Sequence, residues 1–267
     1  MELPIYQVDA FAMEVFKGNP AAIMPLDKWL PDVTLQALAM ENNVAETAFF
    51  LPCDNGFELR WFTPTVEVDL CGHATLASAH VLFEHLDYQG DDILFHTRSG
   101  ELRVSRGPAG LTLDFPAAEL EAAQVDDNIC AALGSAVIAN EAVIARENPH
   151  AVVYVYSCQK DVANLAPNAA QLLAASDYSV IATAPGDDCD FVSRFFGPHV
   201  GIDEDPVTGS AHCSLVPYWA AQLARTTLRA RQISARGGDL LCELKNGRVF
   251  MTGSGITFMH GTVLLPD

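Results

Sequence analysis

A glutamate at the start of an apolar, β-type run is the first residue in this chain that could carry a proton. Glu46 directly precedes the segment 47–50, Thr-Ala-Phe-Phe. Burial there would strip water from the carboxylate and raise its pKa, which suits a general base or acid near neutral pH. The same segment also fits a capped or solvent-facing glutamate at a strand end. Glu46 is therefore a candidate catalytic residue, and the sequence leaves both interpretations open.

A histidine directly follows a glycine where a helix is expected to begin. His73 follows Gly72 and opens a run of small, apolar residues. The positive end of a helix dipole opposes a positive charge, so an imidazole at this position is expected to stay neutral. It could then donate a hydrogen bond to a substrate oxygen or transfer a proton. A solvent-exposed histidine at a helix start is the plain alternative.

Three acidic residues precede a second such helix start, in the segment 203–205, Asp-Glu-Asp. Acidic residues before a helix are expected from the dipole alone, at several tenths of a kcal/mol each. Asp205 is the preferred candidate because Pro206 fixes the turn after it and directs it toward Gly209. Ser210 corresponds in position to His73, and it could simply cap the helix.

These residues belong to a sequence that occurs twice. Segments 71–74 (Cys-Gly-His-Ala) and 208–211 (Thr-Gly-Ser-Ala) each follow an acidic turn and open a helical run. Upstream, segments 57–64 and 191–198 are identical at four of eight positions. Glycine lets a ligand approach the backbone, and the N–H groups of a helix start attract anions. The repeat therefore predicts two half-sites for one small anionic molecule.

The surrounding elements repeat in the same order, which predicts an α+β fold made of two similar halves. Each half has a strand, a helix and a strand before the Gly-led helix, and an alternating hairpin after it. The first half is expected to contain strands 21–24, 47–51, 93–97, 101–105 and 111–115 and helix 32–40. The second is expected to contain strands 151–156, 179–184, 228–233, 240–245 and 248–252 and helix 168–175. We place the crossover between domains in the soft stretch 116–127.

Composition limits the classes of partner. The chain has 267 residues, with 15 Lys and Arg against 34 Asp and Glu, for a net charge of −19. Nucleic acids and anionic membranes require a basic surface, so neither is expected as a partner. An anionic substrate must therefore be held by local dipoles. No apolar run approaches the length of a membrane span, so no span is expected, and no signal peptide is expected from the N-terminal residues.

Seven cysteines occur with no paired spacing, which favours a reduced cytoplasmic protein. The chain has no HExxH segment and no finger-type Cys/His spacing, so no metal is expected. His80 and His212 have no carboxylate at ligand spacing, and both are expected to be packing or surface residues.

Taken together, the motifs resemble the phenazine-biosynthesis (PhzF-like) isomerase family, which is related in fold to diaminopimelate epimerase. The resemblance covers essentially the whole chain. It rests on segments 8–11, 16–22, 43–49, 67–75, 204–211 and 236–238.

The resemblance implies two pseudo-symmetric domains, each with a mixed, barrel-like curled sheet around a central helix, and an active site in the cleft between them. The expected domains are 1–118 with 257–267, and 119–256. The resemblance also implies a homodimer. The mechanism that we expect is a cofactor-independent proton shift. Glu46 then matches the family's proton carrier, with His73 and Asp205 assisting. The expected substrate-binding residues are Asn19, Gly72, Gly209 and Ser210.

One departure separates the chain from the epimerase relatives, which use one cysteine at each helix start as base and acid. Here the first start has Cys71, whereas the second has Thr208, and Cys213 lies too far into the helix. A symmetric two-thiol racemase is therefore not expected. The leading hypothesis is an isomerase that moves a proton and a double bond on a small carboxylate. A racemase or epimerase using Glu46 or Cys71, and a non-catalytic binding protein, remain as alternatives.

Overall fold

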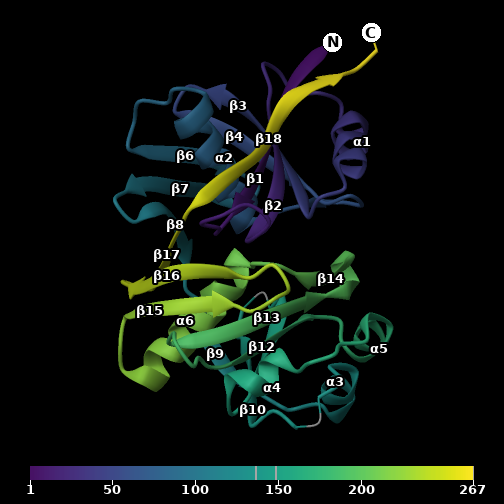
Figure 1. Cartoon of the computed structure of the whole chain (residues 1–267), viewed down its shortest axis with the longest axis vertical. Helices are drawn as coiled ribbons and strands as arrows, with labels where there is room; N and C mark the ends of the chain where they lie inside the picture. The colour runs from purple at the N-terminus through teal and green to yellow at the C-terminus, as the bar shows by residue number, and fades with distance from the viewer. Residues whose placement is uncertain (136, 148, 267) are drawn as a thin grey trace. The chain divides into compact units, whose positions relative to one another are not determined.

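The chain divides into two compact units in the computed structural model (Figure 1). The structure describes residues 1–135, 137–147 and 149–266. Unit 1 consists of Met1–Asp114 and the segment from Thr252 onward, and unit 2 is Phe115–Met251. The expected boundaries were 118/119 and 256/257. Each unit is described below by itself.

Unit 1 contains the elements of the first half of the repeat and the C-terminal strand. Its strands are β1 (Glu2–Ala10), β2 (Asn19–Pro25), β3 (Glu46–Cys53), β4 (Gly56–Phe62), β5 (Glu67–Val68), β6 (Asp92–Thr97), β7 (Gly100–Gly107), β8 (Gly110–Pro116) and β18 (Gly255–Leu264). Its helices are α1 (Asp32–Asn42) and α2 (Gly72–His85). Every strand and helix expected in the first half is therefore present.

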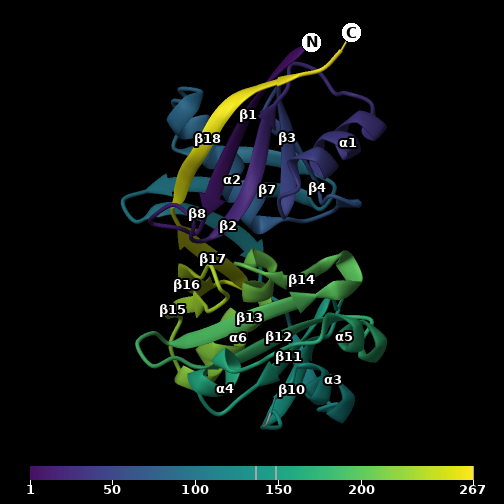
Figure 2. The ribbon, with the colours of Figure 1, turned by 45° about the vertical axis from the view of Figure 1, so that its right-hand side comes forward.

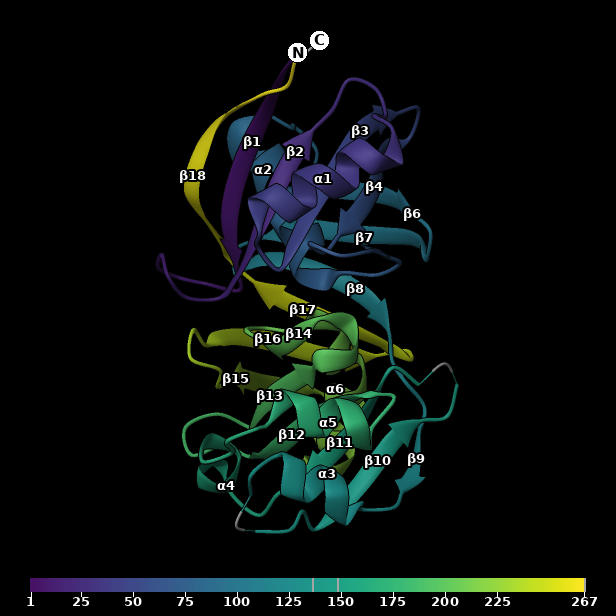
Figure 3. The same cartoon turned by 90° about the vertical axis from the view of Figure 1, so that its right-hand side faces the viewer.

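The strands of unit 1 form one mixed sheet. β18 pairs with β1, β1 with β2, β3 with β4, β6 with β7 and β7 with β8, all antiparallel. β2 with β3, and β4 with β6, are parallel. Figure 3 shows β18, β1 and β2 side by side. Buried and partly exposed residues alternate along β8, as its period of two predicted.

The two helices of unit 1 cover the sheet. Leu35, Leu38 and Ala39 of α1 join an apolar cluster with residues of β1, β2, β3 and β4. α2 packs against β1, β2, β3, β7 and β18, so the sheet curls around this helix (Figure 2). Most residues of α2 are buried, including the polar His73, Thr75 and Ser78.

Unit 2 contains the elements of the second half. Its strands are β9 (Leu120–Ala123), β10 (Glu141–Ala145), β11 (Ala151–Val155), β12 (Ser179–Pro185), β13 (Phe191–Gly197), β14 (Ile202–Asp205), β15 (Thr227–Gln232), β16 (Gly238–Lys245) and β17 (Arg248–Gly253). Its helices are α3 (Asp127–Ala132), α4 (Gln159–Ala163), α5 (Ala169–Ala175), the short η1 (Pro198–Val200) and α6 (Gly209–Leu223).

The pairings of unit 2 repeat those of unit 1. β11 and β12 are parallel like β2 and β3, and β13 and β15 are parallel like β4 and β6. The antiparallel pairs β9–β10, β10–β11, β12–β13 and β15–β16 match β18–β1, β1–β2, β3–β4 and β6–β7. α6 contacts β11, β15 and β16, in the place of α2. The duplication read from the sequence is therefore a duplication of topology.

One expectation differs from the structure. The sequence predicts a crossover between domains in the stretch 116–127, but residues 120–123 form β9 and pair with β10. Strand β9 follows β8 of unit 1 and joins the sheet of unit 2, whereas β18 follows β17 of unit 2 and joins the sheet of unit 1. Each half of the repeat thus gives its last strand to the other unit.

Candidate functional site

Two parallel strands place the first candidate residues at one end of the sheet of unit 1. Asn19 is the first residue of β2 and Glu46 is the first residue of β3. The register pairs Ala21 with Glu46, so both strands begin at the same edge. Asn19 is fully buried and Glu46 is 7% exposed. The solvent-facing interpretation of Glu46 is therefore wrong.

The start of α2 supplies the next residues. Cys71 is the N-cap residue, with an extended backbone (φ −145°, ψ 110°), and Gly72 is the first helical residue. His73 follows as the second residue and is 3% exposed, which excludes the solvent-exposed alternative for this histidine. The Thr75 hydroxyl donates to the carbonyl of Cys71 and fixes the first turn. Helix α2 therefore begins at the segment 71–74, as the sequence predicted.

His73 lies at the centre of these residues. Its Nε2 is 3.1 Å from Oε2 of Glu46. On the other side of the ring, Nδ1 is 3.1 Å from the amide nitrogen of Asn19 and 3.5 Å from Sγ of Cys71. The imidazole therefore connects a carboxylate on one side with a thiol and an amide on the other. We call Asn19, Glu46, Cys71 and His73 the carboxylate–imidazole cluster.

The Glu46 carboxylate affects the pKa values of both His73 and Cys71. Burial by itself lowers the pKa of His73, but the Glu46 carboxylate beside the ring outweighs burial and raises that pKa well above its usual value. The expected neutral imidazole is therefore not supported. Burial and the Glu46 carboxylate raise the pKa of the Cys71 thiol to about 11, so it carries a proton at neutral pH.

The same residues offer a set of metal ligands that local spacing did not reveal. One ligand atom from each of Glu46, Cys71 and His73 lies within 4.8 Å of the others. Carboxylate, thiolate and imidazole are ligands of zinc. Glu46 lies far from the other two in the sequence and is brought to them by the pairing of β3, so a search for spacing motifs could not find the set.

Asp205 is the second buried acid of the repeat motifs, and it lies in unit 2. It ends β14 and is 4% exposed, whereas Asp203 is exposed and Glu204 pairs with Arg194. The Thr208 hydroxyl donates to Oδ2 of Asp205 at 2.5 Å. The preference for Asp205 among the three acids agrees with this burial.

A glutamine that sequence reasoning missed completes the surroundings of Asp205. The Gln232 side chain donates to the carbonyl of Asp205 at 2.6 Å and accepts from the backbone N–H of Thr208 at 2.8 Å. Gln232 ends β15 and carries no local motif, so only the sheet pairing reveals it. The start of α6 is thus held by side chains from β14 and β15.

The remaining candidates lie at the start of α6. Gly209 is its first residue and is buried, and Ser210 is its second and is partly exposed. Thr208, not Ser210, is the N-cap residue, so the capping role considered for Ser210 is wrong. His212 is buried in the helix, and His80 bonds Thr257, as expected for packing residues.

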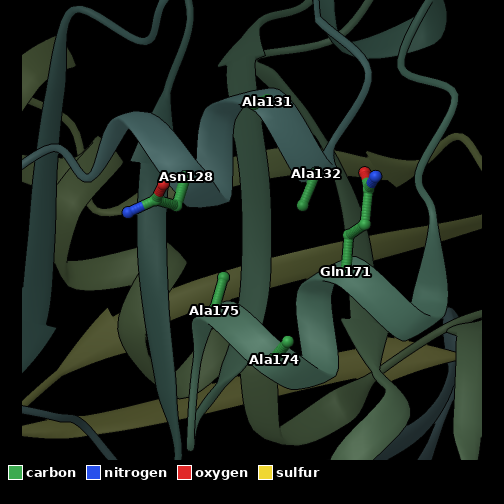
Figure 4. Close-up of a pocket in the computed structure, with 6 residues that line it drawn as sticks. All are labelled: Asn128, Ala131, Ala132, Gln171, Ala174 and Ala175. Carbon is green, nitrogen blue, oxygen red and sulfur yellow. The ribbon is translucent and has the colours of Figure 1, made fainter.

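Two cavities lie away from these residues. In unit 2, a cavity of about 460 Å³ separates the short helices α3 and α5, and its lining consists of Asn128, Gln171 and four alanines (Figure 4). In unit 1, a groove of about 410 Å³ lies beside Leu82 of α2 and Leu86, the C-cap residue of that helix, with Glu2 and Asp27 in its lining. Neither includes a member of the carboxylate–imidazole cluster.

Residues 8–261 match the family described as phenazine biosynthesis-like protein, PhzC-PhzF. The chain belongs to this family. It is 50% identical to an uncharacterized isomerase of Pseudomonas aeruginosa over 99% of this chain and 100% of that protein. An uncharacterized isomerase of Halalkalibacterium halodurans is 42% identical, with 99% and 100% covered. Family membership and these relatives support an activity of the isomerase or epimerase kind.

Solved structures agree with the family and its fold. A PhzF-family protein of Enterococcus faecalis superposes with a TM-score of 0.93 at 45% identity, covering 99% of this chain and 100% of that one. A hydroxyproline epimerase from Agrobacterium vitis shares the fold with a TM-score of 0.62 at 12% identity, covering 100% and 93%. Among the described residues, no helix is long and apolar enough to cross a membrane.

Proposed function

We propose that this PhzF-family protein is a cofactor-independent isomerase that moves a proton, with the accompanying double bond, on a small carboxylate-bearing substrate. The observation that carries the proposal is the 3.1 Å approach of the buried Glu46 carboxylate to Nε2 of His73 at the start of α2. A buried acid beside an imidazole is the arrangement that general acid–base catalysis uses.

Three residues of the cluster and the start of α2 have roles in the proposed reaction. Glu46 removes a proton from a carbon next to a carbonyl or unsaturated group and returns it to another carbon. His73 balances the charge of the carboxylate, and the backbone N–H groups at Gly72 face the substrate carboxylate. Asn19 contributes an amide to the substrate. Donors preorganised for a developing carbanion are typically worth about 2–4 kcal/mol each.

Asp205 is kept as a charge-relaying residue in the proposal, and Gly209 and Ser210 as substrate-binding residues. Asp205 is buried and bonded to the hydroxyl of Thr208, which gives it a fixed position from which to relay charge. The α6 start at Gly209 has the same Gly-led form as the α2 start, so its backbone N–H groups are themselves suited to an anion.

Solvent exchange of substrate protons tests the assignment of Glu46. Small unsaturated and oxo carboxylic acids would be incubated with the enzyme in D₂O, and loss of C–H signals followed by NMR. We expect Glu46→Gln to reduce exchange at least about a hundredfold, because it removes the proton carrier. A variant that exchanges as fast as the wild type would overturn the proposal.

A matched control is available in the same unit. Glu101 also faces a histidine, with its Oε1 3.7 Å from Nδ1 of His96, but its side chain is 67% exposed. Glu101→Gln makes the same chemical change outside the cluster, and we expect it to exchange at the wild-type rate. Circular dichroism of both variants checks that the fold is kept.

A racemase or epimerase that uses Cys71 is the second candidate. The observation in its favour is the protonated thiol 3.5 Å from Nδ1 of His73, which could return a proton to the opposite face of a carbanion. Chirality of the product separates the two reactions. If Cys71→Ser abolishes turnover while Glu46→Gln does not, the second candidate replaces the first.

A further inference from the structure

The carboxylate–imidazole cluster contains three side chains of the kinds that bind zinc. One ligand atom from each of Glu46, Cys71 and His73 lies within 4.8 Å of the other two. The three residues are buried, with 7%, 5% and 3% of their surface exposed. Zinc sites use thiolate, imidazole and carboxylate ligands, and a site with three protein ligands leaves a fourth position for water. The cluster therefore has the ligand types and the ligand number of a three-ligand zinc site.

The spacing of these atoms is close to that of a tetrahedral metal site. Bonds of about 2.0–2.3 Å to zinc place the ligand atoms about 3.3–3.8 Å apart. In the structure, Oε2 of Glu46 lies 3.1 Å from Nε2 of His73, and Sγ of Cys71 lies 3.5 Å from Nδ1. These contacts use different nitrogens of one ring, so a metal held by one nitrogen must draw in the third ligand. The widest pair would then close by no more than about 1.5 Å.

Two of the ligand atoms have no hydrogen bond. Oε2 of Glu46 and Nε2 of His73 approach each other, but neither makes a hydrogen bond to any residue that the structure describes, although both atoms are buried. Buried polar atoms in proteins nearly always have a partner, and an ion can be that partner. A cation between the carboxylate and the ring would accept an electron pair from each of these two atoms.

The duplicated fold is built without this set of ligands in its second half. The register of the parallel strands puts Ser179 of β12 in the place of Glu46 in β3. At the start of α6, Thr208 stands in the place of Cys71, and Ser210 follows where α2 has its histidine. Hydroxyl groups are not among the usual ligands of zinc. The architecture therefore does not require the three ligands, and they are particular to unit 1.

We propose that Glu46, Cys71 and His73 bind a thiophilic divalent cation, zinc or a metal of its class, and that the bound cation switches the enzyme off. On binding, each side chain forms one bond to the metal, the Cys71 thiol gives its proton to the buffer, and the metal loses the waters that these ligands replace. The cation is an inhibitor, because it holds the carboxylate that must accept the substrate proton. The binding stands on the geometry of the cluster, whereas the inhibition rests on the function proposed for Glu46.

Cobalt binding to the full chain tests the site without any substrate. Co²⁺ takes the place of zinc, and a thiolate bound to it produces a charge-transfer band in the near ultraviolet. We expect the wild type to bind one Co²⁺ with this band, and added Zn²⁺ to remove the band. Cys71→Ser should abolish the band. Glu46→Gln should weaken Co²⁺ binding at least about tenfold, since even a change outside the ligand shell costs a metal site about that much affinity.

The matched control is Cys158→Ser, because Cys158 is an exposed cysteine outside the cluster. We expect this variant to keep the band and the cobalt affinity of the wild type, and circular dichroism checks that each variant is folded. A wild type without the band, or a Cys71→Ser protein that keeps it, overturns the metal site. Loss of the band in Cys158→Ser also overturns it, since the thiolate would then lie elsewhere.

Solvent exchange of substrate protons separates the metal site from the proposed function. Zn²⁺ should stop the deuterium exchange of the wild type, and a chelator should restore it. If the cobalt band forms but the metal-free protein exchanges no substrate, the isomerase proposal fails and the metal site stands. Full exchange by the zinc-loaded protein overturns the inhibition and leaves the isomerase proposal in place.

Discussion

Two histidines near the two Gly-led helix starts have opposite electrostatic surroundings. His73 faces Glu46 and Cys71, and its pKa is raised. His212 is fully buried, and its Nδ1 lies 2.8 Å from the carbonyl of Thr208, which fixes the proton on Nδ1. Burial lowers the pKa of His212 to about 4, against a smaller opposing effect of that carbonyl. The first imidazole is suited to carrying charge, and the second only joins the helix to its N-cap.

The lowered pKa of His212 predicts a loss of stability in acid. Between about pH 6.5 and pH 4 the unfolded state binds a proton at this histidine and the folded state does not. The free energy of unfolding should therefore fall as the pH drops through this window, by up to about 3 kcal/mol. We expect His212→Asn, whose amide can still donate to Thr208, to remove this contribution to the fall in the free energy of unfolding. Urea unfolding at pH 7 and pH 4 measures it.

The matched control is His96→Asn, at a histidine whose side chain is 34% exposed. This variant should lose as much free energy of unfolding between pH 7 and pH 4 as the wild type. If His212→Asn also loses as much as the wild type, the result would contradict the buried neutral imidazole.

At the scale of elements, both units use the same ion pair to brace the strand before the Gly-led helix. Arg60 of β4 makes two bonds to Glu67, at 2.7 and 2.8 Å, and Arg194 of β13 makes two to Glu204 at the same distances. Each guanidinium also lies over a phenylalanine ring of its own strand. The four identical positions of the repeat thus include the residues that hold β4 to β5 and β13 to β14.

Removing one of these arginines should lower the free energy of unfolding far more than removing an exposed arginine. The Arg194 side chain is 11% exposed and also donates to the carbonyl of Leu165, so Arg194→Ala leaves partly buried groups unpaired. We expect it to lower the free energy of unfolding by about 2–4 kcal/mol. Arg231→Ala removes a more exposed arginine and should cost about 1 kcal/mol or less. If denaturant unfolding shows similar losses of unfolding free energy in Arg194→Ala and Arg231→Ala, the result would contradict the bracing role.

The two halves of the repeat share their architecture, but they differ in the residues proposed for catalysis. The register pairs Ala21 with Glu46 in unit 1 and Ala151 with Ser179 in unit 2, so Ser179 occupies the place of Glu46. Thr208 likewise stands in the place of Cys71 at the helix N-cap. The proposed proton carrier therefore belongs to one half of the duplication alone.

At the scale of the whole molecule, the net charge of −19 opposes the approach of an anionic substrate. Raising the ionic strength from about 0.01 M to about 0.15 M shortens the Debye length from about 30 Å to about 8 Å. We expect the association rate of any carboxylate substrate found by deuterium exchange to rise over this range. Stopped-flow binding measures it, and the uncharged amide of the same compound is the control. A rate that falls with salt would show that local positive potential dominates.

The sequence by itself determined the duplication, the two Gly-led starts and the helices and strands that repeat around them, because apolar periodicity, turn residues and helix-start motifs are local properties of the chain. It did not predict β9, β10, β18, α3 or α4. It also singled out Glu46, His73 and Asp205, although solvent-exposed alternatives remained open for the first two. Only the tertiary structure decided their burial, brought Glu46 to the imidazole of His73, and reversed the expected charge preference of that ring. It also revealed Gln232 and the exchange of β9 and β18. Those features depend on pairing between strands far apart in the sequence, and no local pattern encodes which distant groups become neighbours when water is excluded.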